Sequence, residues 1–545
     1  MKSILRKSMW IPCIVISACL TTQAQNPDIL WTHSYGGSDQ DIFYSFEPTS
    51  DNGFLLIGDS RSNDGDIQDS ARGTDALLMK IDANGQLQWE NEIGGSNYDH
   101  SYTAQQIHAG YIVSIESKSD DGDSPGNHDN YDFLCMKLDW DGNILWAKDF
   151  GGSKHDHPTC IKQTVDGGFI MAGGSASNDG DVSNHHGTTN TMDVWVVKLD
   201  SLGNLIWSKS IGGTEDDFGL YVQCIPSGGY VVVGESISND GDFSGHHGTT
   251  PNEDLLVMKL DNSGNIQWQK FYGGSLDDVA HYVTLTPEGG FLIAGATNST
   301  DGDVSINKGK KDYWILKLRS NGKIAWQKTY GGSNGEAARF IDRSNDGGYV
   351  VAGECASSDG DVITNHGQND CWVIGIDAHG NLKWQKSLGG SSDDSGKSVA
   401  QLSDGSVVVG CSSNSTNGDV TDHHGLSGTT DFWIVKLGTI NEAKGISALQ
   451  SKDALTPPAT LSVYPNPSLG NFTVTLETGA SENCEAAIEV INLLGQSYSI
   501  DKGQWTVDNG RLMKEIQMSD VADGMYLVKV TVGDKIFTAQ IDLQK

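Results

Sequence analysis

Short runs of alternating apolar and polar residues fill most of the chain. In the clearest stretch, a run from Leu220 to Ile225 is followed by a glycine turn and a β-branched run from Tyr230 to Ser236. A long polar loop then leads to a run from Asp254 to Leu260, an Asn/Gly turn and a run from Ile266 to Tyr272. A two-residue period bounded by Gly, Asn and Asp is typical of β-strands joined by hairpins. We therefore expect a unit of four antiparallel strands, named A to D.

This unit recurs along the chain. Its marker tryptophan stands at Trp31, Trp89, Trp146, Trp207, Trp268, Trp326 and Trp384, at spacings of 57 to 61 residues. A Gly-Gly-Ser/Thr step begins at Gly36, Gly94, Gly151, Gly212, Gly273, Gly331 and Gly389. A period near 60 built of short strands indicates a propeller or an array, because one unit cannot bury its own apolar faces.

The two ends of the repeat region predict a closed ring. The seventh copy stops after its strand C at Asp431–Leu437, and the missing strand D stands at the start of the region, as Ile29-Leu30-Trp31. A first strand that completes the last blade removes both open edges. The expected fold is all-β, with a seven-bladed β-propeller over residues 25–440, four antiparallel strands per blade and the N-terminal strand closing the last blade.

The N-terminus has the layout of a secretory signal peptide. Basic residues precede an apolar run from Met9 to Leu20, and small and polar residues follow up to Ala24 and Gln25. We expect residues 1–24 to be removed by cleavage between Ala24 and Gln25. The alternative is a lipobox in which Cys19 is acylated and retained. The apolar run is too short for a lasting anchor, and no later stretch approaches the ~20 apolar residues of a membrane helix.

The charge excludes one class of partner. The chain has 71 acidic and 36 basic residues, a net charge of −35. Signal cleavage removes three basic residues and no acidic one, taking the net charge from −35 to −38. Such a chain repels a polyanion, so nucleic acid is not an expected partner.

Seven of the nine cysteines lie beyond the signal peptide, an odd number without CxxC spacing. Neither a zinc site of paired cysteines nor a disulfide framework is indicated. Cys355 and Cys371, at facing ends of two predicted strands, are placed either to pair or to act as two buried thiols.

Acidic residues repeat on the face where the D–A and B–C connections emerge. One follows each Gly-Gly step, at Asp41, Asp99, Asp156, Asp217, Asp278, Glu336 and Asp394, and another opens each strand C. The B–C loops carry Asp/Asn-Gly-Asp, with acids at Asp64, Asp66, Asp121, Asp123, Asp179, Asp181, Asp240, Asp242, Asp301, Asp303, Asp359, Asp361 and Asp419. Such loops suit Ca²⁺ as a cofactor. Alternatively, they are Asx turns that bind backbone N–H groups. Sevenfold repetition favours the turn.

Three blades depart from the others in the length of the B–C loop. Blades three, four and seven have the longer loops, and these carry His185 and His186, His246 and His247, and His423 and His424. Their shared departure makes them candidate ligand-face residues. Adjacent residues of an extended segment point to opposite sides, so such a pair rarely chelates one ion, and histidines that cap carbonyls are the competing interpretation.

HExxH, a P-loop and GxGxxG are absent from the sequence. Gly58-Asp59-Ser60 resembles a lipase nucleophile motif, but in register it is the end of a strand B. A carboxylate pair of a glycosidase would be hidden among so many acids, because spacing alone does not reveal it.

After Leu437 the pattern changes. Residues 441–460 form an expected linker, and residues 461–545 are β-rich, typical of a small β-sandwich. The segment contains Tyr464-Pro465-Asn466-Pro467, Gly495 in an Asn-Leu-Leu-Gly-Gln run, Gly524, Tyr526 and Lys529 in a final strand, and a terminal Lys545. At these residues it resembles the type A C-terminal sorting domain of the type IX secretion system of Bacteroidetes.

The resemblance implies Sec export, contact with the type IX secretion machinery, passage across the outer membrane and removal of the domain. The propeller would then be secreted or attached to the cell surface. The repeats resemble ~60-residue propeller repeats of secreted proteins of the same phylum, a group with no single activity.

We therefore expect a non-catalytic binding or adhesion module that holds an extracellular glycan or protein on its loop face. The alternative is a secreted glycan-active hydrolase or lyase with a carboxylate pair on that face. A purely structural spacer is disfavoured, since three blades depart together in their loops.

Overall fold

The computed structural model describes residues 26–68, 73–124, 126–128, 130–188, 190–426 and 428–439, and most strand residues between 461 and 543. The chain divides into two compact units, residues 1–444 and 445–545, which are described separately. The described residues form strands, turns and loops, and they include no helix of the length and hydropathy needed to cross a membrane. The expected signal peptide, including Ala24 and Gln25, and the expected linker lie outside the described residues.

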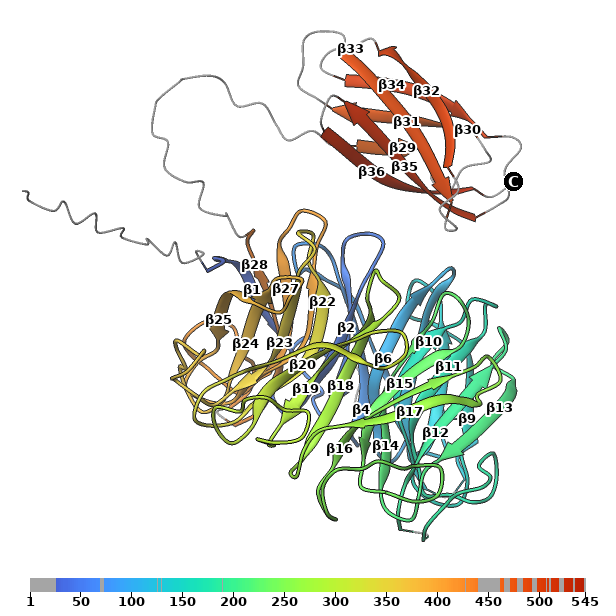
Figure 1. Ribbon diagram of the computed structural model, residues 1–545, viewed down its shortest axis with the longest axis vertical. Coiled ribbons are helices and arrows are strands. Elements are labelled where there is room, and N and C mark those ends of the chain that lie inside the picture. The colour runs from blue at the N-terminus through green and yellow to red at the C-terminus, as the bar shows by residue number, and fades with distance from the viewer. Residues whose placement is uncertain are drawn as a thin grey trace, which may run out of the picture. The chain divides into compact units, whose positions relative to one another are not determined.

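The first unit contains seven four-stranded antiparallel sheets (Figure 1). Strands A are β2 (Asp41–Pro48), β6 (Asp99–Ile107), β10 (Asp156–Gln163), β14 (Asp217–Cys224), β18 (Asp278–Leu285), β22 (Glu336–Arg343) and β26 (Asp394–Gln401). Strands B are β3 (Phe54–Ser60), β7 (Gly110–Ser117), β11 (Phe169–Ser175), β15 (Tyr230–Ser236), β19 (Phe291–Thr297), β23 (Tyr349–Cys355) and β27 (Val407–Ser413). Strands C are β4 (Asp75–Ile81), β8 (Asp132–Leu138), β12 (Asp193–Leu199), β16 (Asp254–Leu260), β20 (Asp312–Leu318), β24 (Asp370–Ile376) and β28 (Asp431–Leu437). Strands D are β5 (Leu87–Ile93), β9 (Ile144–Phe150), β13 (Leu205–Ile211), β17 (Ile266–Tyr272), β21 (Ile324–Tyr330), β25 (Leu382–Leu388) and β1 (Ile29–Tyr35).

The ring closes through its N-terminal strand. β1 pairs antiparallel with β28, with Trp31 opposite Lys436 and Tyr35 opposite Phe432. In Figure 1 the blue β1 lies beside the orange β28. Each strand A contacts the strand A of the next blade, and β2 contacts β26, so strands A are innermost. The expected closed seven-bladed β-propeller is confirmed.

The apolar core lies between successive blades. Strands B and C are almost wholly buried, and strands C supply four fully buried tryptophans: Trp195, Trp314, Trp372 and Trp433. The marker tryptophans of strands D cover the C–D turn of the following blade. For example, a Cβ added at Gly142 would lie 3.1 Å from the ring of Trp89, and one at Gly203 would lie 2.8 Å from Trp146. Glycine therefore allows the indole to lie directly on the turn.

The second unit contains two four-stranded antiparallel sheets, in the orders β29-β30-β34-β33 and β32-β31-β35-β36. Its strands are β29 (Leu461–Tyr464), β30 (Asn471–Glu477), β31 (Cys484–Asn492), β32 (Ser497–Trp505), β33 (Val507–Asp508), β34 (Arg511–Gln517), β35 (Gly524–Val532) and β36 (Lys535–Leu543). Apolar side chains from both sheets form one core, including Val474, Val490, Ile516 and Val528. This is the arrangement of a small β-sandwich.

Candidate functional site

The Asp-Gly-Asp loops hold the backbone of their own blade. Asp64 Oδ1 accepts the N–H of Ser38 at 2.6 Å, and the Asp66 N–H donates to the carbonyl of Gly36 at 3.0 Å. The first contact recurs in every blade, with Asn417 as acceptor in the seventh. A Cβ at Gly37 would lie 2.5 Å from the carbonyl oxygen of Asp64, so the loop needs glycine there. An Asx turn would bind an N–H two residues further along the chain, whereas each of these side chains binds an N–H 25 or 26 residues earlier, in the connection to strand A. Calcium binding by the loops stays a prediction.

The loop histidines mostly contact the acid that opens strand C. Five histidines bind this carboxylate twice: the second histidine of each pair and the single His128 and His366. Each donates its backbone N–H to the carboxylate, and its ring Nδ1 lies 2.7 to 3.0 Å from the same group. The first histidines turn Nε2 toward Thr188 O, Asn252 O and Thr429 Oγ1. Lys308 takes the same place in blade five and reaches Asp361 of the next blade. Ligand contact by the six paired histidines stays a prediction.

The inner strands differ from blade to blade, in contrast to the loops. Numbered from its first residue, each strand A has an acid at position 1 and a β-bulge at position 4. The residues at position 4 are Tyr44, Tyr102, Thr159, Leu220, His281, Arg339 and Lys397. Those at position 7 are Glu47, Gln105, Lys162, Gln223, Thr284, Asp342 and Ala400. Bulges re-aim side chains next to functional sites. Here they divide the central channel, the space surrounded by the seven strands A, into two regions.

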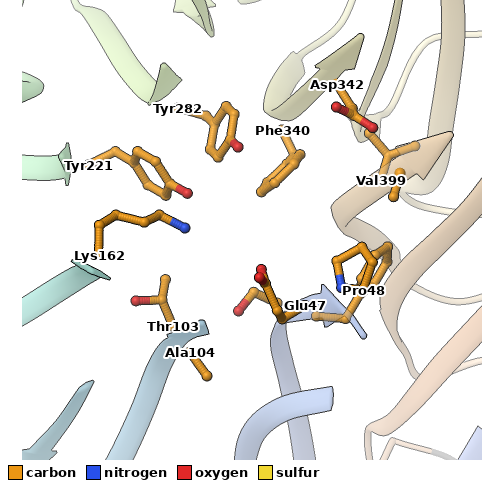
Figure 2. Close-up of a pocket in the computed structure, with 13 residues that line it drawn as sticks. Glu47, Pro48, Thr103, Ala104, Lys162, Tyr221, Tyr282, Phe340, Asp342 and Val399 are labelled. Atoms are coloured by element: carbon orange, nitrogen blue, oxygen red, sulfur yellow. The ribbon is translucent and has the colours of Figure 1, made fainter. Parts of the chain in front are cut away.

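The first region, which we call the channel pocket, is a cavity of about 150 Å³ lined by all seven strands A (Figure 2). Its lining comes from the second half of these strands, so it lies toward the A–B turns. Three aromatic rings form a continuous wall: Tyr221 and Tyr282 have centroids 4.3 Å apart, and Tyr282 and Phe340 have centroids 3.8 Å apart. The wall offers an apolar face to a ring-shaped ligand.

Charged groups complete the channel pocket. Lys162 Nζ lies 5.2 Å from the centroid of the Tyr221 ring, and Figure 2 shows Lys162 and Glu47 pointing toward the same space. Burial raises the pKa of Glu47, an effect that Lys162 partly offsets. Burial also raises the pKa of Asp342, whose Oδ2 accepts the Gln401 N–H at 3.0 Å. The pocket therefore combines two acidic side chains and one basic side chain, all able to form hydrogen bonds, with an aromatic wall.

The second region, which we call the loop-face mouth, lies where strands A begin and strands B end. Four strands B carry an acid at their penultimate residue: Asp59, Glu116, Glu235 and Glu354. Two of these acids, Asp59 and Glu116, hold histidines from the next blade, and Glu354 holds an arginine from its own blade. His100 Nδ1 lies 2.6 Å from Asp59 Oδ2. Arg339, which belongs to the same blade as Glu354, binds one oxygen of Glu354 at 2.8 Å. The hydroxyl of Ser395, from the next blade, donates to the other oxygen of Glu354 at 2.6 Å. Glu116 contacts two histidines.

Glu235 differs from the other three acids of the mouth. Among the described residues, no cation lies within ion-pair distance of it. Burial, and then repulsion from Glu253, raises the pKa of Glu235 to about 7. This carboxyl group is thus partly protonated near neutral pH.

Sequence reasoning found neither region of the channel. The available signal was the contrast between the first position of strand A, which is acidic in every blade, and its variable fourth and seventh positions. His155 and His157, spaced i and i+2 at the start of β10, were a second signal, because alternate residues of a strand share a face. Among the described residues, the one group of three acidic, histidine or cysteine side chains near enough to share an ion is Glu116, His155 and His157, not an Asp-Gly-Asp loop.

The structure also describes the two cysteines and some of the C-terminal residues that the sequence singled out. Cys355 and Cys371 are both buried free thiols. Tyr464 ends β29, and Gly524, Tyr526 and Lys529 lie in β35, where Lys529 Nζ is 3.3 Å from Glu489 Oε2. Pro465, Asn466, Pro467, Gly495 and Lys545 lie outside the described residues.

The propeller has distant relatives. The regulatory protein FlaEY of Caulobacter vibrioides is 24% identical over 343 residues, covering 57% of this chain and 35% of that protein. The chain thus spans about a third of the length of this relative.

Solved structures with a similar arrangement include puromycin hydrolase (10% identity, TM-score 0.40, covering 82% of this chain and 60% of that one). Cobalt-substituted apocarotenoid oxygenase of Synechocystis is 11% identical, with a TM-score of 0.34 and coverage of 72% and 88%. A member of the DUF4221 family from Bacteroides vulgatus is 10% identical, with a TM-score of 0.30 and coverage of 60% and 92%. At TM-scores below 0.5, none of these likenesses carries a functional argument.

The second unit has a specific match. Residues 462–543 match the family described as secretion system C-terminal sorting domain. This is the segment in which Tyr464, Gly524, Tyr526 and Lys529 carried the resemblance, and the match confirms it. The chain therefore carries a sorting domain that addresses the type IX secretion machinery, and it is secreted to the cell surface or the extracellular space.

Proposed function

We propose that this chain is a secreted binding protein whose ligand is held in the channel pocket. One observation carries the proposal: the pocket is lined by all seven inner strands, yet its residues repeat in no regular pattern around the ring. Residues that serve only the fold recur in every blade, as the Gly-Gly step does. Seven different contributions to one cavity are what recognition of an asymmetric ligand requires.

The favoured ligand is the end of a glycan. A cavity of about 150 Å³ accommodates one six-membered ring. The apolar face of a sugar would lie on the aromatic wall of Tyr221, Tyr282 and Phe340. Its hydroxyl groups would bond to Glu47 and Lys162, which offer an acceptor and a donor. A loop-face ligand, as expected from the sequence, stays a prediction.

The test is binding by the mature full-length chain, with glycan and peptide arrays followed by calorimetry on the best ligand. We expect a glycan to bind, and Phe340→Ala and Lys162→Met to weaken binding at least about 10-fold, equivalent to about 1.4 kcal/mol. Gln223→Met is the matched control, because Gln223 has the register of Lys162 in the next blade and does not line the pocket. Binding that survives both pocket variants would contradict the proposal.

The second candidate function is hydrolysis of a glycan, and Glu235 favours it. A carboxyl group with a pKa of about 7 is suited to protonate a leaving group. Incubation with polysaccharides and analysis of the products would detect turnover. Turnover that Glu235→Gln abolishes would replace the binding proposal with a hydrolase, whereas binding without turnover would remove this candidate.

A further inference from the structure

Two histidines and one buried acid meet at a blade boundary of the loop-face mouth. His155 precedes β10 by one residue, and His157 is its second residue, so both imidazoles lie on one side of the strand. Glu116 comes from β7 of the preceding blade. Its Oε1 lies 2.6 Å from His155 Nε2 and 2.7 Å from His157 Nδ1, and one ligand atom of each of the three residues falls within 4.8 Å of the others.

Neighbouring side chains hold the three residues in place. Glu116 is 4% exposed, and its Oε2 accepts the hydroxyl of Tyr102 at 3.3 Å. The ring of His155 lies 4.9 Å from Tyr131, and that of His157 lies 4.9 Å from Tyr102. Such surrounding contacts fix the orientation of side chains that ligate a metal. The imidazoles are 39% and 21% exposed, so an ion has access from solvent.

We propose that Glu116, His155 and His157 bind one zinc ion. Two imidazole nitrogens and one carboxylate oxygen are a donor set that Zn²⁺ takes with bond lengths of about 2.0 to 2.2 Å, leaving a fourth position for water or a ligand atom. Ca²⁺ is disfavoured, since it takes six to eight oxygen ligands. The proposal does not rest on the proposed function, because the channel pocket shares none of these residues.

The neighbouring boundary provides a matched control. His100 Nδ1 lies 2.6 Å from Asp59 Oδ2, the same pairing of a position-2 histidine with a penultimate acid. A second imidazole, however, is present beside Glu116 and not beside Asp59 among the described residues. His100→Ala therefore removes an equivalent ion pair while leaving the zinc ligands intact.

The test measures zinc bound to the EDTA-treated mature chain by calorimetry, in the presence of excess Mg²⁺ to saturate the acidic surface. We expect one zinc ion per chain, an affinity at least about 10-fold lower in His157→Ala and in Glu116→Gln, and no change in His100→Ala. Co²⁺ in place of zinc should give a visible absorption band of a low-coordinate site, lost in the same two variants.

Glu116→Gln keeps the size of the side chain, so we expect the variant to retain the fold. Its melting temperature without metal, compared with that of the wild type, checks this. No stoichiometric zinc, or equal affinity in the wild type and His157→Ala, would overturn the proposal. Loss of zinc in His100→Ala as well would also overturn it. Lys162→Met should bind zinc normally, so a failure of the glycan proposal and a failure of the zinc proposal are distinguishable.

Discussion

The loop frame and the channel lining of this propeller are built on the same strands but follow opposite rules. Position 1 of strand A is Asp in six blades and Glu336 in the other, whereas position 4 ranges from Tyr44 to Leu220 to Lys397. Only two residues lie between an almost invariant position and a variable one. The difference separates residues whose backbone contacts repeat in every blade from residues whose contacts change from blade to blade.

The reason is a difference in what each side chain must satisfy. Asp217 accepts the Gly213 N–H at 2.7 Å and the Ser238 hydroxyl at 2.9 Å, and the Ser236 hydroxyl bonds its other oxygen. A buried backbone N–H or hydroxyl without a partner costs free energy in every blade, so the acid repeats. Among the channel side chains such a contact is made in some blades only, as by Asp342 with the Gln401 N–H at 3.0 Å.

The largest effect is expected from opening the frame. Deleting residues 27–33 removes most of β1, and with it the ladder on β28 and the packing of Trp31. We expect a loss on the order of 5 kcal/mol or more in the free energy of unfolding, because an edge of the last blade is exposed. Thermal melting followed by circular dichroism tests this, and a truncated chain that melts like the full one would refute ring closure through β1.

A change of pH should act on the acids of the frame. Burial raises the pKa of Asp132 and Asp217 to about 7 and that of Asp41 and Asp156 to about 6, against 3.8 ordinarily. Carboxyl groups with a raised folded-state pKa favour the folded chain while they are protonated, and this stability is lost as the pH rises through that pKa.

We therefore expect the free energy of unfolding to fall by a few kcal/mol between about pH 4 and pH 7. Glu116 acts in the opposite sense but at lower pH, since hydrogen bonds from His155 and His157 outweigh burial and lower its pKa to about 2. Urea titrations at several pH values measure the slope. Asp217→Asn should flatten it, and stability that increases from pH 5 to pH 7 would contradict the assignment.

A single substitution in each region tests the comparison directly. Asp217→Ala leaves the Gly213 N–H and two serine hydroxyls without their acceptor, and we expect a loss of about 3 kcal/mol. Gln223→Ala, in the same strand, should cost less than about 1 kcal/mol. Urea unfolding of both variants gives the two values, and equal losses would remove the distinction between frame and lining.

The smallest effect is expected from calcium. Each first acid of the loops already holds a backbone N–H, so Ca²⁺ and NaCl at equal ionic strength should raise the melting temperature alike, by screening the net charge of −35. A much larger shift with Ca²⁺, reversed by a chelator, would identify the loops as ion sites by mass action.

The sequence by itself determined the frame and the destination of the chain. The period near 60, the alternation within each run and the strand displaced to the N-terminus predicted seven four-stranded blades and their closure, because these depend on local hairpin chemistry. Tyr464-Pro465-Asn466-Pro467 and the Gly524 strand likewise indicated the sorting domain, since a motif is read along the chain.

Only the tertiary structure decided what meets in the channel. Glu116 and His157 are 41 residues apart and come together because strand B of one blade lies against strand A of the next. Glu47 and Asp342 face one cavity because the ring returns the chain to its starting point. Repeats show which residues are equivalent in sequence, but the curvature of the closed ring places non-equivalent residues within reach of one ligand.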